Sequence, residues 1–271
     1  MNWFKIYIRS SLHVALAVSA LVGITANEFD IKILKYFYYF IFFSTISGYN
    51  FVKFVSIYKS SKHEISLSLK LIQLISVIAG LFFYFQLSEV SMVVILFLAI
   101  LTFLYANPLH KNKNLRNLTG LKISIVALVW ASITVVLPIL NENIELLNKN
   151  VWLSFIQRFL FIFILTLPFE IRDLKFDESK IETLPQRLGV CKTKLIGTFL
   201  LFVVLVLEFF KDEINKNHLY SLALITPILF LFLLFSKKNE PKYYSSFWVE
   251  SIPIVWYGLS SLIQYNFNAF N

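Results

Sequence analysis

Nine apolar segments follow one another along the chain, and their number and length limit what it can fold into. They cover residues 10–27, 34–52, 68–87, 89–106, 121–140, 151–171, 193–209, 218–236 and 245–265. A helix that crosses a bilayer needs about 20 mainly apolar residues, and the segments together use about two thirds of the chain. The loops between them are short. The sequence therefore predicts an all-α integral membrane protein, a bundle of nine transmembrane helices forming one domain over residues 1–271.

The composition excludes a soluble domain. Soluble domains are about half apolar and about a quarter charged, whereas this chain is 58% hydrophobic and 15% charged and carries 29 Phe and 13 Tyr. The net charge of +9 fits loops that face an anionic membrane leaflet. We therefore expect membrane lipid, and no nucleic acid, among the partners.

Cysteine and histidine offer no metal site of their own. The single Cys191 excludes an intramolecular disulfide and a zinc site built from several cysteines. The four His residues show no metal-ligand spacing. The N-terminal stretch resembles a signal peptide in its basic start and apolar run, but no clear cleavage site follows, so we interpret it as the first retained helix.

Lysine and arginine are distributed unevenly between alternate loops. If the N-terminus is cytoplasmic, the cytoplasmic side holds 19 of these residues and the opposite side holds 5. Basic residues concentrate on the cytoplasmic side of membrane proteins. The pattern predicts a cytoplasmic N-terminus and an outside C-terminus. It points to a bacterial-type inner (cell) membrane, with an organelle membrane as the alternative.

Three carboxylates follow the sixth segment at helical spacing. Glu170, Asp173 and Asp177 are at positions i, i+3 and i+7, which places them on one helical face over about 10 Å. Stacked like charges repel unless a cation lies among them, and Mg²⁺ favours one or two carboxylates plus phosphates and water. The alternative is an ordinary acidic helix end that pairs with neighbouring basic residues: Arg172, Lys175 and Lys180.

Two further polar groups end apolar segments on the same predicted side. After the fourth segment, a stretch beginning at Tyr105 carries basic side chains suited to a diphosphate: Lys111, Lys113, Arg116 and Lys122. At the end of the second segment, Asn50 offers an amide and Lys53 a charge. Taken alone, each group could be a basic loop or a polar helix end at the interface. Together with the carboxylates they predict an amphiphilic ligand, with an anionic head at the cytoplasmic rim and an apolar tail between helices.

These motifs resemble those of the UbiA superfamily of intramembrane prenyltransferases over essentially the whole chain. Glu170-x-x-Asp173-x-x-x-Asp177, followed by Thr183-Leu-Pro and Gly189, resembles the second Asp-rich motif of that family, with Glu in place of the leading Asp. Tyr105 resembles the Tyr of the family's Tyr-x-x-x-Lys segment, with the lysine, Lys111, offset by two positions. Family members are nine-helix bundles whose two Asp-rich motifs hold Mg²⁺ and an isoprenoid diphosphate.

The first Asp-rich motif departs from the family pattern Asn-Asp-x-x-Asp-x-x-x-Asp. Asn50 matches its first residue, but the acidic positions are occupied by Phe51, Phe54 and Tyr58. Half of the expected metal site is therefore missing. One hypothesis restores it, because Lys53 could supply positive charge where a second Mg²⁺ would otherwise lie.

The resemblance implies a set of roles. Mg²⁺ would be the cofactor, an isoprenyl diphosphate the donor, and a lipophilic molecule of aromatic or quinone type the acceptor. The implied metal ligands are Glu170, Asp173 and Asp177, and the implied catalytic residues are Asp173, Asp177 and Lys53. The implied diphosphate-binding residues are Asn50, Tyr105, Lys111, Arg116 and Lys122.

Two functions remain open on this reading. The first is an active prenyltransferase, a transferase of alkyl groups other than methyl. The second is a non-catalytic protein that binds a polyprenyl lipid or acts as a membrane scaffold. A transporter is disfavoured because matching halves with interrupted spans are not evident.

Overall fold

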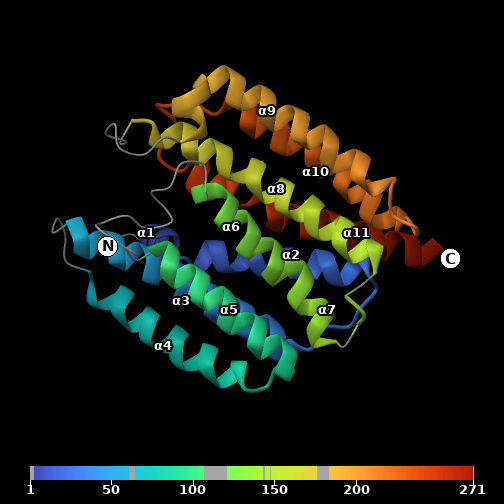
Figure 1. Cartoon of the computed structure of the whole chain (residues 1–271), viewed down its shortest axis with the longest axis horizontal. Helices are drawn as coiled ribbons and strands as arrows, with labels where there is room; N and C mark the ends of the chain where they lie inside the picture. The colour runs from blue at the N-terminus through green and yellow to red at the C-terminus, as the bar shows by residue number, and fades with distance from the viewer. Residues whose placement is uncertain are drawn as a thin grey trace.

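A computed structural model describes residues 3–60, 65–106, 121–142, 144–146, 148–175 and 183–270, and this part of the chain is helical without strands. Figure 1 shows the helices packed side by side as a bundle. Their bounds are α1 Trp3–Arg9, α2 Leu12–Glu28, α3 Lys35–Ser60, α4 Leu67–Tyr84, α5 Glu89–Ala106, α6 Leu121–Ala131, η2 Ser132–Val136, α7 Leu137–Asn141, α8 Lys149–Asp173, α9 Leu184–Glu208, α10 Lys216–Phe235, η3 Tyr244–Val249 and α11 Ile252–Phe270.

Every predicted apolar segment is helical, but several are interrupted. The first begins earlier than predicted and is broken at Ser10 and Ser11, where α1 and α2 meet at a bend of 57°. Ser11 has φ 65, a left-handed conformation that is rare outside glycine. The fifth segment continues through the π-helical turn η2 between α6 and α7. Such wide turns and bends shift the side-chain register within an otherwise continuous span.

The seventh segment also begins earlier than predicted. Thr183 caps α9 through a capping box with Gln186, and the helix then bends at Gly189, which has φ 81. A side chain at that dihedral angle would be strained, so glycine permits the bend. Residues 184–188 therefore form a short helical turn before the straight part of α9.

The core of the bundle lies between α2, α3, α8, α10 and α11. The largest buried side chains there include Phe37, Phe161 and Trp256. In contrast, α4 and α5 expose large apolar side chains along most of their length, among them Leu74 and Phe97. An exposed apolar surface of this extent fits contact with lipid, because lipid chains solvate it as well as a protein core does.

The helices are of the kind that crosses membranes. Within the described residues, six are long and apolar enough to do so: α4, α5, the α6–η2–α7 run, α8, α9 and α10. The bent pair α1 and α2 would be a seventh if it forms one span. The chain is thus an all-helical integral membrane protein. The count of nine spans and the orientation of the termini stay predictions.

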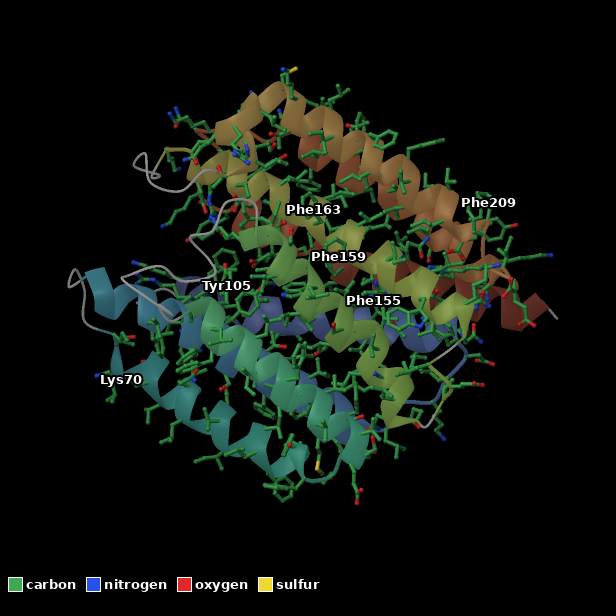
Figure 2. All side chains as sticks on the ribbon, in the orientation of Figure 1. Lys70, Tyr105, Phe155, Phe159, Phe163 and Phe209 are labelled. Carbon is green, nitrogen blue, oxygen red and sulfur yellow. The ribbon has the colours of Figure 1, made fainter. Side chains whose placement is uncertain are left out.

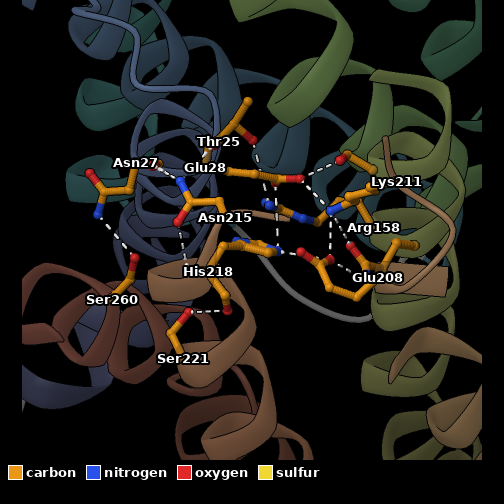
Figure 3. A network of polar contacts seen from close by, with 12 residues as sticks. Thr25, Asn27, Glu28, Arg158, Glu208, Lys211, Asn215, His218, Ser221 and Ser260 are labelled. Atoms are coloured by element: carbon orange, nitrogen blue, oxygen red, sulfur yellow. Dashed lines mark hydrogen bonds and ion pairs between the residues drawn. The ribbon is translucent and has the colours of Figure 1, made fainter. Parts of the chain in front are cut away.

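Buried charges occupy one end of the bundle, where α8 begins (Figure 3). Lys211 Nζ lies 2.6 Å from Glu28 Oε1 and 2.6 Å from Glu208 Oε2. Arg158 Nη1 donates to the carbonyl of Leu21 over 2.8 Å. The imidazole of His218 lies 3.7 Å from both carboxylates. We call Glu28, Arg158, Glu208, Lys211 and His218 the buried charge network; it ties α2, α8, α9 and α10 together.

Candidate functional site

The candidate site lies at the other end of α8, where the helix ends in carboxylates. Glu170 Oε1 is 2.7 Å from Lys122 Nζ at the start of α6, and Asp173 Oδ2 is 3.8 Å from the same nitrogen. The structure thus brings three predicted site residues together. The i, i+3 spacing explains this, because it places both carboxylates on the face of α8 that packs against α6. The helix α8 ends at Asp173, and the third predicted carboxylate, Asp177, lies outside the described residues.

Asp173 lies between two cations. Arg172 Nε donates to its Oδ1 over 2.8 Å, and Arg172 Nη2 forms an ion pair with the same oxygen over 2.8 Å. The guanidinium also lies over the ring of Phe169, 5.1 Å from its centroid. The pairing with Arg172 is the one expected for an ordinary acidic helix end, whereas the pairing of both carboxylates with Lys122 was not expected from the sequence.

The two carboxylates fit a Mg²⁺ ion that is completed by other ligands. Among the described residues no group of three or more His, Cys, Asp or Glu side chains forms a metal site. The oxygens of Glu170 and Asp173 nevertheless converge on a single cation, the ammonium of Lys122. Mg²⁺ typically takes one or two carboxylates together with phosphate oxygens and water. The donor set fits that arrangement and does not fit an all-protein cage.

A second polar group lies where α3 packs against the bend between α1 and α2. Lys53 Nζ donates to Ser11 Oγ over 2.7 Å, and Ser11 Oγ donates to Asn50 Oδ1 over 2.9 Å. Asn50 is fully buried. The degenerate first motif is therefore not simply a lost site, because its amide and lysine are held in a defined hydrogen-bonded arrangement.

Tyr49, Tyr105 and Glu250 lie between the carboxylate end of α8 and the polar group around Lys53. Tyr105, labelled at the end of α5 in Figure 2, lies near both Tyr49 and Lys122. Trp130 of α6 donates to the hydroxyl of Tyr49 over 2.9 Å. Glu250, at the bend between η3 and α11, acts electrostatically on Lys53 and on Arg172. The site therefore draws on α3, α5, α6, α8 and the bend before α11.

Three predicted site residues, Lys111, Arg116 and Asp177, lie outside the described residues. In turn, the structure adds two residues to the site that were not predicted, Ser11 and Glu250. Glu250 had a usable signal, because an ionisable side chain inside an apolar segment is costly and often functional. Ser11 had none, since its place beside Asn50 depends on the 57° bend.

Fold and site together define a class of protein, a helical membrane bundle with paired carboxylates and basic side chains at one end. Solved structures of UbiA homologues resemble it in shape. A UbiA homologue from Aeropyrum pernix K1 has a TM-score of 0.67 at 14% identity, covering 97% of this chain and 99% of that one. A UbiA homologue from Archaeoglobus fulgidus, bound to GPP and Mg²⁺, has a TM-score of 0.63 at 11% identity, covering 97% and 99%.

A digeranylgeranylglyceryl phosphate synthase also shares the fold, with a TM-score of 0.57 at 18% identity and coverage of 97% of both chains. No family model and no curated protein sequence matches the chain. The chain thus has the UbiA fold, and the resemblance predicted from its sequence motifs is confirmed at the level of the fold.

Proposed function

We propose that the chain is an intramembrane prenyltransferase that moves an isoprenyl group from a prenyl diphosphate to a lipophilic acceptor of aromatic or quinone type. The observation that carries the proposal is the convergence of Glu170 and Asp173 on one cation position at the end of α8, within a UbiA fold. Structural neighbours support the substrate class, since one is bound to GPP and Mg²⁺ and another is a digeranylgeranylglyceryl phosphate synthase. The whole chain, 1–271, would act as one domain in a bacterial inner membrane.

The proposed site divides the work between its residues. Glu170, Asp173 and Asp177 would hold Mg²⁺, which when bound supplies Lewis-acid charge to the departing diphosphate. Lys122 already lies beside two of these carboxylates. Its ammonium can therefore bind the diphosphate and stabilise the negative charge that develops on the leaving oxygens. Tyr105, Lys111, Arg116 and Asn50 are proposed as further donors to the same group, and Lys53 as a catalytic charge.

The proposed reaction breaks the bond between the allylic carbon and the diphosphate oxygen, and the electron pair leaves with the diphosphate. The allylic carbon becomes cationic, the acceptor forms the new bond to it, and the acceptor loses a proton. Water must be kept away from the cation. The aromatic interior near Tyr49 and Trp130 suits this requirement, because aromatic faces attract cations without attacking them.

The prenyl tail would lie along α8. Phe155, Phe159 and Phe163 follow one another at four-residue spacing on this helix, and Figure 2 shows them in sequence along it toward the candidate site. All three are half-buried, and the rings of Phe159 and Phe163 are 6.3 Å apart. Such a stripe is often part of a helix core; here we propose it as one wall of the tail site.

The test is the binding of a non-hydrolysable geranyl diphosphate analogue to the purified chain, measured as a thermal shift with and without Mg²⁺. A ligand that binds only the folded state raises the unfolding temperature. We expect a Mg²⁺-dependent shift that is lost in Glu170→Gln and Asp173→Asn. Asp212→Asn, which changes an exposed carboxylate at the opposite end, should retain it.

The competing function, a non-catalytic binder of polyprenyl lipid, is favoured by the absence of carboxylates at Phe51 and Phe54. Product formation with labelled donor separates the two functions. A shift that needs Mg²⁺ together with transfer to an acceptor supports the enzyme. An unchanged unfolding temperature at saturating analogue, in a protein that folds, contradicts the proposed donor site.

A further inference from the structure

The bend between α1 and α2 leaves the N-terminus of a long helix next to the degenerate first motif. α2 runs for 17 residues from Leu12, and its N-cap residue Ser11 makes no side-chain capping bond to the helix. The first backbone N–H groups of a helix lack partners within it and carry partial positive charge. Such a helix start favours an anion with oxygen acceptors.

Asn50 gives an independent sign that an acceptor belongs here. Its Oδ1 accepts from Ser11, which fixes the amide beside the start of α2. Asn50 is 0% exposed, and its buried Nδ2 has no hydrogen-bond partner among the residues that the structure describes. A buried donor without an acceptor is costly, and most such groups in proteins are satisfied by a ligand, an ion or water.

Lys53 brings a full positive charge to the same place. Besides its bond to Ser11, its Nζ lies 3.5 Å from the carbonyl of Arg9, and the charge of Arg9 acts on it. Among the described residues, Glu250 is the carboxylate whose charge acts on Lys53, and it would compete with any anion. We call Ser11, Asn50, Lys53 and the start of α2 the anion cradle.

We propose that the anion cradle binds one phosphate group of the prenyl diphosphate without a metal ion. The inference rests on the proposed function and deepens it. In place of carboxylates and a second Mg²⁺, an ammonium, an amide and a helix start would bind this phosphate. Phosphate binding then does not require carboxylates at the positions of Phe51 and Phe54. Carboxylates at those positions would repel the phosphate unless a metal lay between.

The experiment measures binding of inorganic pyrophosphate to the purified full chain by equilibrium dialysis, in EDTA and in Mg²⁺. We expect binding in EDTA. Lys53→Met should weaken it about tenfold, the effect of losing one charged hydrogen bond, and Lys53→Arg should restore most of it. Glu250→Gln should strengthen binding, because it removes the competing carboxylate. Lys149→Met, at the exposed opposite end, is the matched control.

Two outcomes would overturn the cradle: no binding of pyrophosphate in EDTA, or equal binding by the wild type and Lys53→Met. If Lys53→Met does not fold, Asn50→Asp decides instead, since a carboxylate at this position should abolish binding in EDTA. Displacement by soluble short-chain phosphatidic acid but not by geranyl diphosphate would assign the cradle to a lipid headgroup and refute the proposal as stated.

The same measurements keep the two proposals apart. Glu170→Gln and Asp173→Asn should lose the additional binding that Mg²⁺ provides and should not weaken binding in EDTA. Binding in EDTA without any gain from Mg²⁺ would retain the cradle and contradict the proposed metal site. A gain from Mg²⁺ without binding in EDTA would do the reverse.

Discussion

Two lysine–carboxylate pairs of equal length lie at the end of the bundle opposite the candidate site, and they differ in their surroundings. Lys211 and Glu28 are 2.6 Å apart with side chains 3% and 5% exposed. Lys149 and Asp212 are also 2.6 Å apart, with side chains 57% and 61% exposed. Water screens the second pair and releases its members at little cost, whereas a buried charge that loses its partner stays unsolvated.

Lys211→Met should therefore lower the free energy of unfolding by about 3–5 kcal/mol, because it leaves Glu28 and Glu208 buried without their cation. Lys149→Met should change it by less than about 1 kcal/mol. Reversible unfolding in mixed micelles, followed by tryptophan fluorescence, measures both. Equal effects of the two substitutions would show that the buried charge network is not as water-free as its geometry implies.

The contribution of Lys211 has a defined pH dependence. Burial by itself lowers the pKa of Lys211, but the carboxylates of Glu28 and Glu208 outweigh burial and hold the pKa above its ordinary value. The stabilisation is fully present below the ordinary lysine pKa of about 10.4 and is lost as pH rises through the raised value. The difference in unfolding free energy between wild type and Lys211→Met should stay constant around neutral pH, and on the alkaline side it should shrink only in strong alkali.

At the scale of the helices, the close packing of α9 against α8 and α10 depends on the absence of a side chain at Gly197. A Cβ added at Gly197 of α9 would lie 2.5 Å from Leu233 of α10 and 2.8 Å from Leu167 of α8. Both leucines are fully buried, so neither can move aside freely. Gly197 thus lets three helices meet, as small residues do in membrane bundles.

Gly197→Ala should destabilise the protein by about 1–3 kcal/mol, the range typical of overpacking. Gly258→Ala is the matched control, because nothing lies within 4 Å of a Cβ at this helical position. There alanine should stabilise by up to about 1 kcal/mol through its helix propensity. Unfolding temperatures in detergent test both, and a stabilised Gly197→Ala would contradict the packing described.

The sequence predicted the helices well and their interruptions poorly. Long apolar runs need backbone hydrogen bonds inside a membrane, which leaves helix as the favoured structure. The predicted segments 68–87 and 89–106 correspond to α4 and α5, with a short turn between them. The break at Ser10–Ser11 and the turn η2 were missed. The first break lies at two serines, and η2 is followed by Pro138 at the start of α7, whose effect on the span was not predicted. Both interruptions also depend on how neighbouring helices pack.

The candidate site was predictable to the extent that it follows helix register. Glu170 and Asp173 share a face by spacing alone, and the structure brings both to Lys122. That Lys122 is their partner could not be read from the sequence, because it requires α6 to pack against α8. The sequence marks Glu250 as an ionisable residue within an apolar segment, but its place near Lys53 and Arg172 also depends on tertiary packing.

At the scale of the whole molecule, the distribution of basic residues among the loops predicts how the chain is oriented in the membrane. The single cysteine, Cys191, is exposed near the start of α9, in the part predicted to be cytoplasmic. A membrane-impermeant maleimide should label it in inverted vesicles and not in intact cells. Glu213→Cys in a Cys191→Ser background, in the exposed turn before α10, should show the reverse, and labelling of Cys191 in intact cells would contradict a cytoplasmic N-terminus.

The buried charge network also bears on how the chain is assembled during synthesis. Glu28 and Lys211 are 183 residues apart, so most of the chain is made before the carboxylate can meet its ammonium. Until α9 and the turn after it are inserted, Glu28 must stay at the membrane surface, in contact with water or lipid headgroups. The helices made last therefore complete the packing of the first ones. A nascent chain stopped before α9 should remain loosely packed, and its first helices should be the part most accessible to quality-control proteases.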